Sequence, residues 1–336
     1  MPLSSKAEPL RRWLPDPFIL ALLAAVAVAS LLPCQGAVAV GFKWLTAAAI
    51  ALLFFMHGVR LSREAVAAGM RHWRLHLTIL AVSFGLFPLI GLGLYAALPD
   101  LLPRPLWLGV LFVCILPSTV QSSIAFTSIA RGNVSAAVCA AAASNLIGMA
   151  LTPLLAGLIL QLHGGGPTLG QVGKILVQLL LPFAAGQLLR PQLGAWADRN
   201  RRLVAISDRS SILLVVYTSF SAAVIQGVWA QLPPARLLVL TLVLAAILAV
   251  ALLVTTFGAR LLGFSKEDEI AIVFCGSKKS LASGVPMANV LFAGPTVGLT
   301  VLPLMIFHQI QLMVCATLAR RYAARDSRPE PLSGGG

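Results

Sequence analysis

The sequence contains little charge, and acidic charge is especially scarce. Charged residues make up 11% of the chain, and only 11 of its 336 residues are Asp or Glu. Because soluble domains carry about a quarter charged residues, much of the surface must face lipid rather than water. The net charge of +14 does not indicate a nucleic-acid-binding protein, because the basic residues recur at the ends of apolar runs instead of forming one patch.

Several motifs of enzymes and pumps are missing. The five cysteines show no CxxC or Cys/His spacing, so we interpret them as small buried apolar side chains and expect no metal site. No GxxxxGK[ST] stretch supports ATP-driven pumping, and neither GxSxG nor HExxH is present. We therefore expect no cofactor.

Long apolar runs dominate what remains. Hydrophobic residues make up 58% of the chain and the mean hydropathy is +0.90. The runs are continuous and rich in Leu and Ala, unlike the short alternating strands of a membrane β-barrel. The sequence therefore predicts an all-α polytopic membrane protein. We predict ten spans, near residues 16–32, 38–59, 74–97, 105–129, 133–161, 173–194, 207–229, 235–262, 269–292 and 297–320.

The basic residues give this topology an orientation. If the N-terminus is cytoplasmic, most Lys and Arg residues fall on the cytoplasmic side, and the opposite side holds only Lys43, Arg104, Lys174 and Arg236. This is the asymmetry that the positive-inside rule describes. Residues 18–32 after Lys6, Arg11 and Arg12 also resemble a signal peptide. We interpret them as an uncleaved first span, because counting them keeps the topology consistent, with both termini cytoplasmic.

We divide the chain into five parts. They are a cytoplasmic tail at 1–15, the first repeat with the sixth span at 16–194, a basic cytoplasmic connection at 195–206, the last four spans at 207–322 and a disordered tail at 323–336.

Charge in the middle of the predicted spans is limited to two lysines. No carboxylate lies in the middle of a span, whereas Lys278 and Lys279 lie about ten residues into the ninth. Intramembrane charge is costly and usually functional. Gly276, Gly284 and Pro286 should weaken or break the helix around the lysines. The alternative is that one or both side chains reach an interface.

A second polar cluster occupies the matching place in the first half. Pro117 is followed by Ser118, Thr119, Gln121, Ser122 and Ser123 in span four, and Ser144 and Asn145 lie in span five. These groups either bond within their own helices or hold helices together, or they form a site. Polar, Pro/Gly-interrupted segments at matching positions of two inverted halves are typical of a transporter site.

The candidate substrate- or ion-binding residues follow from these clusters. They are Ser118, Thr119, Gln121, Ser122, Ser123, Ser144, Asn145, Ser277, Lys278, Lys279, Ser280 and His308. His57 and His308 are lone intramembrane histidines, which more commonly make a structural hydrogen bond; His308 could instead line a cavity.

Five segments together resemble the bile acid:sodium symporter family, in its SBF-like branch and as a bacterial member. They are 55–61, 116–123, 131–133, 274–281 and 302–309, and the resemblance covers about residues 16–322. It implies two inverted five-helix repeats, a panel domain of spans 1, 2, 6 and 7, and a core domain of spans 3–5 and 8–10. Spans 4 and 9 would be broken where they cross. It also implies the inner membrane of a bacterium.

The sodium-binding residues of the better-known family members are replaced here. The Glu and Gln of the ninth-span motif correspond to Phe274 and Lys278, a third-span Gln corresponds to Ser83, and fifth-span hydroxyls fall near Ala137 and Ala141. Sodium coupling therefore does not carry over. Our hypothesis is that Lys278 or Lys279 stands in for sodium, or binds an anionic substrate directly. A buried lysine could also exchange a proton during transport.

The sequence thus predicts a secondary active transporter of a small organic anion that works by alternating access, and not an enzyme. The expected partners are that anion and the lipid bilayer, without nucleic acid; the oligomeric state stays open, with a monomer as one option. A channel or regulatory membrane protein is the main alternative. A hydrolase that uses Ser122, Ser277 or Ser280 with a lysine is a weaker one.

Overall fold

The computed structural model describes residues 17–60, 72–160, 169–227, 232–292 and 296–325, and every element in these ranges is helical. The expected tail at 1–15, with Lys6, Arg11 and Arg12, lies outside the described residues, as do residues 326–336 of the expected tail at 323–336. Residues 323–325 belong to the last helix, so the predicted tail begins three residues too early. The expected all-α fold is confirmed.

The elements follow one another along the chain. They are α2 (Pro17–Leu31), α3 (Gly36–Arg60), α5 (Trp73–Ala81), the π-helix η2 (Val82–Leu86), α6 (Phe87–Ala97), the 3-10 turn η3 (Pro99–Leu101), α7 (Arg104–Ile115), α8 (Gln121–Ile129), α9 (Val134–Leu155), the π-helix η4 (Ala156–Leu160), α10 (Leu169–Leu188), α11 (Arg190–Arg199), α12 (Arg201–Ile225), α13 (Pro234–Leu261), α14 (Lys266–Gly276), α15 (Leu281–Leu291) and α16 (Thr296–Arg325).

Six helices of the described chain are long and apolar enough to cross a membrane, so this is a multi-pass membrane protein. They are α3, the continuous α5–η2–α6, α9 with η4, α12, α13 and α16. Predicted spans four and nine are each divided into two short helices, α7 with α8 and α14 with α15. The basic stretch at 195–206 is helical apart from Asn200, because Arg, Leu and Ala favour helices whether or not they lie in lipid.

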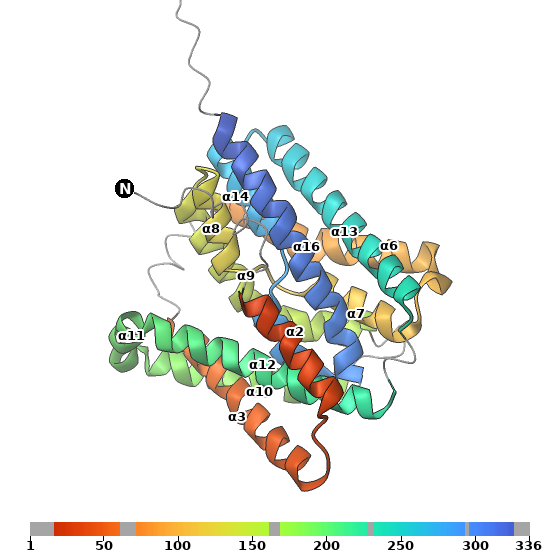
Figure 1. Cartoon of the computed structure of the whole chain (residues 1–336). Coiled ribbons are helices and arrows are strands. Elements are labelled where there is room, and N and C mark those ends of the chain that lie inside the picture. Colours follow the sequence, from red (N-terminus) through yellow and green to blue (C-terminus); the bar gives the residue numbers. More distant parts are fainter. Residues whose placement is uncertain (1–16, 61–71, 161–168, 228–231, 293–295, 326–336) are drawn as a thin grey trace, which may run out of the picture.

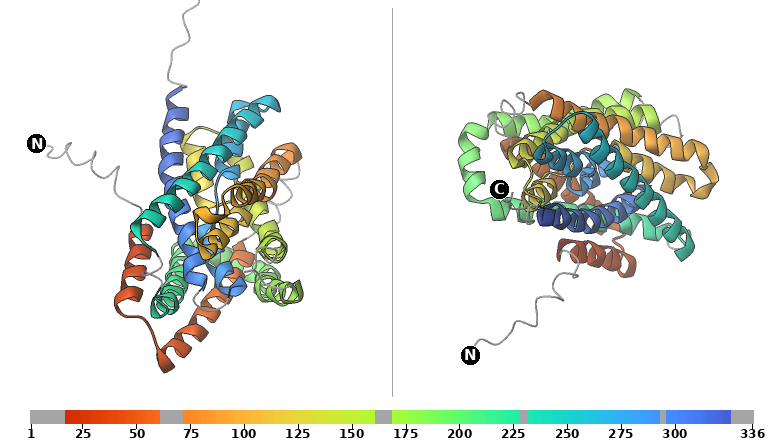
Figure 2. Two further views of the ribbon diagram at one scale, coloured as in Figure 1. Left: turned by 90° about the vertical axis from the view of Figure 1, so that its right-hand side faces the viewer. Right: turned by 90° about the horizontal axis from the view of Figure 1, so that it is seen from above.

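The helices form two groups (Figure 1). In one group α10 packs on α3, and α12 packs on both α2 and α3. The second group contains α5–α9 and α13–α16, and α12 connects the groups through α15 and α16. Figure 2 shows α2, in red, at the edge of the bundle.

Two glycines bring α3 and α10 into backbone contact. A Cβ on Gly58 would meet the carbonyl oxygen of Phe183, and a Cβ on Gly186 would meet that of Phe55. Small residues that let two membrane helices approach closely are the usual basis of tight packing in lipid. Each helix thus supplies one glycine and one carbonyl to the same contact.

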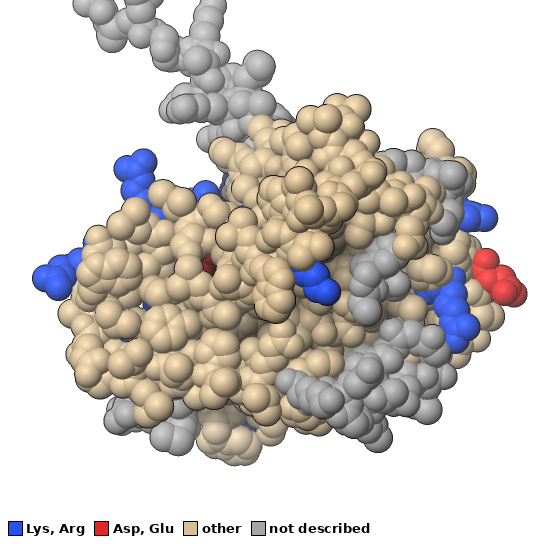
Figure 3. Space-filling view, turned by 90° about the horizontal axis from the view of Figure 1, so that it is seen from below, with Lys and Arg blue, Asp and Glu red and all other residues tan. Residues whose placement is uncertain are grey.

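The surface is apolar over wide areas. Trp44, Leu181 and Leu238 are among the exposed large hydrophobic side chains. Seen from below, the described surface is mainly uncharged, with scattered basic side chains (Figure 3). Such a surface fits lipid contact.

A buried carboxylate connects α13, α14 and α16. The Glu269 side chain is 4% exposed. It accepts hydrogen bonds from Arg260 at 3.1 and 3.2 Å, from Lys266 at 2.7 Å and from the Tyr322 hydroxyl at 2.8 Å. Ser265 caps α14 immediately before this cluster, and its hydroxyl accepts from the Asp268 amide at 3.2 Å. The first turn of α14 is therefore fixed to its neighbours.

We expect Glu269→Gln to lower the stability of the folded protein by about 1–2 kcal/mol, because the buried carboxylate loses charge-assisted hydrogen bonds while its partners Arg260 and Lys266, which are 45% and 42% exposed, stay solvated. The matched control is Asp198→Asn. The Asp198–Arg201 pair is 3.5 Å long and its side chains are 65% and 82% exposed, so its loss should cost almost nothing. Thermal unfolding in detergent measures both, and equal shifts would contradict the prediction.

Candidate functional site

Two interrupted helices meet at their breaks. α7 ends at Ile115 and α8 begins at Gln121; α14 ends at Gly276 and α15 begins at Leu281. Pro117 explains the first break, since proline lacks the N–H that a helix needs. The two unwound segments are joined directly, because the amide of Ser280 donates to the carbonyl of Pro117 at 2.8 Å.

Serine hydroxyls hold the first break against α14. Ser118 Oγ donates to the carbonyl of Cys275, and Ser123 Oγ donates to that of Phe274 at 2.8 Å. Bonding within the own helix is therefore the wrong alternative for Ser118 and Ser123. At the second break, Ser277 does bond within its own helix, because its Oγ donates to Val273 O at 2.6 Å.

Two side chains of α9, the predicted span five, form hydrogen bonds with the backbone at the same break. The Ser118 amide donates to Ser144 Oγ at 3.0 Å, and Asn145 Nδ2 donates to the Ser118 carbonyl at 3.0 Å. Asn145 Oδ1 in turn accepts from Ser283 Oγ of α15 at 2.7 Å. Unwound backbone buried in a membrane protein needs such partners, and here side chains supply them.

The ammonium of Lys279 is bound by backbone carbonyls only. Its Nζ donates to the carbonyl oxygens of Ser83 at 2.7 Å, Cys114 at 2.9 Å and Leu116 at 2.8 Å, and lies 4.1 Å from the ring centroid of Phe87. The side chain is fully buried. We call these three oxygens the carbonyl cage.

Two prolines leave two of the three cage oxygens, those of Ser83 and Cys114, without helical donors. In the π-helix η2 the Phe87 amide bonds to Val82, not to Ser83, and the next residue along, Pro88, has no N–H. At the end of α7 the Ser118 amide, the helical donor for Cys114, bonds to Ser144 instead. Pro117 has no N–H to offer in its place. The lysine therefore supplies hydrogen bonds that the main chain cannot.

Gln311 of α16 makes two hydrogen bonds with the backbone of Lys279. Its Oε1 accepts from the Lys279 amide at 2.9 Å, and its Nε2 donates to the Lys279 carbonyl at 2.9 Å. Nε2 also lies 2.9 Å from His308 Nδ1. The expected structural hydrogen bond of His308 is thus confirmed, and that of His57 is confirmed by its 2.8 Å contact with Leu53 O.

Lys278 has different surroundings. Its Nζ lies 4.0 Å from the ring centroid of Phe126 and 5.5 Å from that of Phe274, and among the described residues it has no hydrogen-bond partner. The whole residue is buried. The alternative that the lysines reach a membrane interface is therefore wrong for both.

A cavity of about 610 Å³ lies beside the crossing, between the two helix groups. We define the core wall by its polar members from the two unwound segments and from α8, α9, α15 and α16. They are Thr119, Gln121, Ser122, Asn145, Ser280, Ser283 and His308. Neither lysine lines the cavity, and Ser118, Ser123, Ser144 and Ser277 are buried around it.

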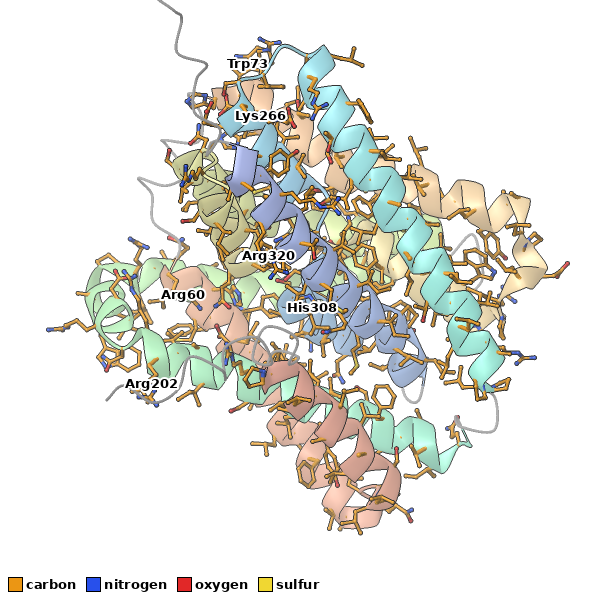
Figure 4. All side chains as sticks on the ribbon, turned by 45° about the horizontal axis from the view of Figure 1, so that its top comes forward. Arg60, Trp73, Arg202, Lys266, His308 and Arg320 are labelled. Atoms are coloured by element: carbon orange, nitrogen blue, oxygen red, sulfur yellow. The ribbon has the colours of Figure 1, made fainter. Side chains whose placement is uncertain are left out.

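The opposite wall carries the formal charges of the cavity. This charged wall consists of His57 and Arg60 on α3 and Asp208 and Arg209 on α12. Figure 4 labels Arg60 at the end of α3 and His308 on α16, one residue from each wall. Our sequence interpretation missed this wall because it treated Arg60 and Arg209 as topology signals and Asp208 as a span-end acid. The signal available was a charged pair, Asp208–Arg209, at the start of an apolar run.

A cavity between two helix groups, beside a crossing of interrupted helices, is the architecture of a membrane transporter. The chain belongs to the SBF-like CPA transporter family, which it matches over residues 16–324.

Individual relatives cover most of the chain. An uncharacterized protein of Pseudomonas aeruginosa, PA2026, is 61% identical over 94% of this chain and 95% of its own length. The protein named "Putative symporter YfeH" of Escherichia coli is 56% identical over 91% and 92%. Sodium/bile acid cotransporter 7 of the mouse is 28% identical over 90% of both chains. The chain is therefore a transporter-family protein and not an enzyme.

Proposed function

We propose that this protein is a secondary active transporter of a small organic anion, in which the Lys279 ammonium takes the place of a coupled sodium ion. The observation that carries the proposal is the carbonyl cage. Main-chain carbonyl oxygens are the groups that replace the hydration shell of an alkali cation in membrane proteins. The protonated ammonium, held by three of them at 2.7–2.9 Å, supplies a positive charge at that position.

The cavity favours an anion. α8 and α15 both begin at its core wall, where Val120, Gln121, Ser280 and Leu281 line it. The first N–H groups of a helix and its dipole favour negative charge. The charged wall contributes two guanidinium groups and one carboxylate, so its net charge is also positive. A cavity with this chemistry suits an organic anion, in line with the bile acid named for the mouse relative.

The arrangement also suits alternating access. We propose ten spans in two inverted repeats, with α2, α3, α10 and α12 as the panel domain and α5–α9 with α13–α16 as the core domain. The cavity between them would open to each side in turn. The basic span ends would face the cytoplasm of a bacterium, with both termini there and the protein in the inner membrane.

Counterflow in proteoliposomes tests the proposal. Vesicles loaded with unlabelled organic anions should accumulate the labelled anion against its gradient, equally in sodium and in choline buffer. Uptake without trans-stimulation would indicate a channel instead. Uptake that requires sodium in the wild-type protein would contradict the role of Lys279.

A further inference from the structure

The charged wall contains one carboxylate with a hydrogen-bond partner on only one of its two oxygens in the described chain. Asp208 is 9% exposed and lines the cavity. Its Oδ2 accepts from Arg60 Nη1 at 2.7 Å, whereas Oδ1 is buried and has no hydrogen-bond partner among the described residues. A carboxylate oxygen accepts about two hydrogen bonds, and buried polar atoms are almost always satisfied. An unsatisfied oxygen in a cavity wall points to a donor on the ligand.

The next residue carries the charge that the wall does not neutralise. The Arg209 guanidinium lies 5.5 Å from the ring centroid of Phe18 on α2, and it makes no ion pair within the described chain. Asp208 is already paired with Arg60. Arg209 is therefore the group of this wall that is left to bind a ligand anion, beside the oxygen that needs a donor.

The charge balance decides which donor fits. A hydroxyl brings a hydrogen to Asp208 Oδ1 without adding charge, so a hydroxy acid keeps its single negative charge for the net positive wall. An amino acid would bring an ammonium into a cavity that already holds two guanidinium groups. The apolar lining, which includes Phe126, Leu146, Met149, Phe183 and Ile212, fits a hydrocarbon body.

We infer that Asp208 and Arg209 are specificity-determining residues that select a hydroxylated organic monoanion, with the hydroxyl on Asp208 Oδ1 and the carboxylate on Arg209. This inference rests on the proposed function, because it names the substrate class of the same cavity. The simplest probe of this class carries its hydroxyl and its carboxylate on neighbouring carbons.

Binding of four matched compounds to the purified full-length protein tests the inference. The compounds are 2-hydroxyhexanoate, hexanoate, 2-aminohexanoate and the uncharged 2-hydroxyhexanamide, and calorimetry in nanodiscs gives the affinities. The hydroxy acid should bind about ten- to a hundredfold more tightly than hexanoate, the range for a hydrogen bond to a charged group. The hydroxy acid should also bind more tightly than the amino acid and the amide.

Variants assign the contacts. Asp208→Ala should remove the preference for the hydroxyl while hexanoate binding persists. The double variant Arg60→Met/Asp208→Ala should do the same without leaving Arg60 unpaired. Arg209→Gln should weaken both acids alike, and Arg202→Gln, on the exposed part of α12, should change nothing.

The outcomes separate the two claims. Equal binding of hydroxyhexanoate and hexanoate, a preference for the amino acid, or a hydroxyl preference that survives Asp208→Ala would overturn the inference while leaving anion transport standing. Binding of neither 2-hydroxyhexanoate nor hexanoate, together with absent counterflow, would overturn the proposed function as well.

Discussion

Replacing Lys279 by methionine should destabilise the protein by at least about 3 kcal/mol and abolish uptake, because three carbonyl oxygens would each lose a buried partner worth about 1 kcal/mol or more. Methionine preserves the apolar stem of the lysine and removes only the ammonium. Thermal unfolding in detergent and uptake into proteoliposomes measure the two effects.

Lys278 is the natural control, because it is the neighbouring residue and is equally buried. Its Nζ satisfies no carbonyl in the described chain, so Lys278→Met should leave stability unchanged or raised, since a buried charge is replaced by an apolar side chain. Similar losses for the two variants would contradict the distinction between the lysines.

Sodium provides a second readout of the carbonyl cage. Removing most of the side chain by Lys279→Ala should leave the oxygens of Ser83, Cys114 and Leu116 available to a small cation. This variant should unfold at a higher temperature in sodium chloride than in choline chloride. The wild-type protein should show no such difference, and a sodium effect in both would argue that the ammonium does not occupy a cation position.

A single methyl group between α3 and α10 should have a comparably large effect. Gly58→Ala and Gly186→Ala should each destabilise the protein by about 3 kcal/mol, the upper part of the usual range for overpacking. The added Cβ meets the partner backbone, which cannot move aside as a side chain can. Loss of the folded fraction in size-exclusion chromatography and a lower unfolding temperature would show the effect.

Each helix offers a matched glycine in open space. A Cβ on Gly41 of α3 or on Gly173 of α10 has no neighbour within 4 Å. Gly41→Ala and Gly173→Ala should therefore be neutral or stabilising by up to about 1 kcal/mol, because alanine loses less backbone entropy in a helix. If all four variants behave alike, the backbone contact does not determine the packing of these helices.

The sequence predicted the helix breaks because breaks have local causes. Pro117 and Gly276 lie at the two breaks, so each interruption is visible within a dozen residues. The expectation was wrong for Gly284 and Pro286, which lie inside the continuous helix α15. Predicted Ser118, Ser123, Ser144 and Asn145 do gather at the first break. Ser118, Ser123 and Ser144 satisfy backbone groups there, whereas Thr119, Gln121, Ser122 and also Asn145 line the cavity.

The sequence could not show that the two lysines have different environments. Their environments differ because residues far apart in the chain, Ser83 and Gln311 for Lys279 and Phe126 for Lys278, approach them in three dimensions. The charged wall was missed for a related reason. A basic residue at a span end has the same local pattern whether it faces lipid headgroups or a cavity.

The carbonyl cage also determines which substitutions this protein should tolerate. Any amino acid brings a carbonyl oxygen, so the side chains at Ser83, Cys114 and Leu116 can change while the ammonium keeps its ligands. The sensitive identities are instead Pro88 and Pro117, which withhold the N–H groups that would compete for the oxygens of Ser83 and Cys114, and neither touches the ammonium through its own carbonyl. A substitution at either proline should therefore disturb the lysine without changing any of its ligands.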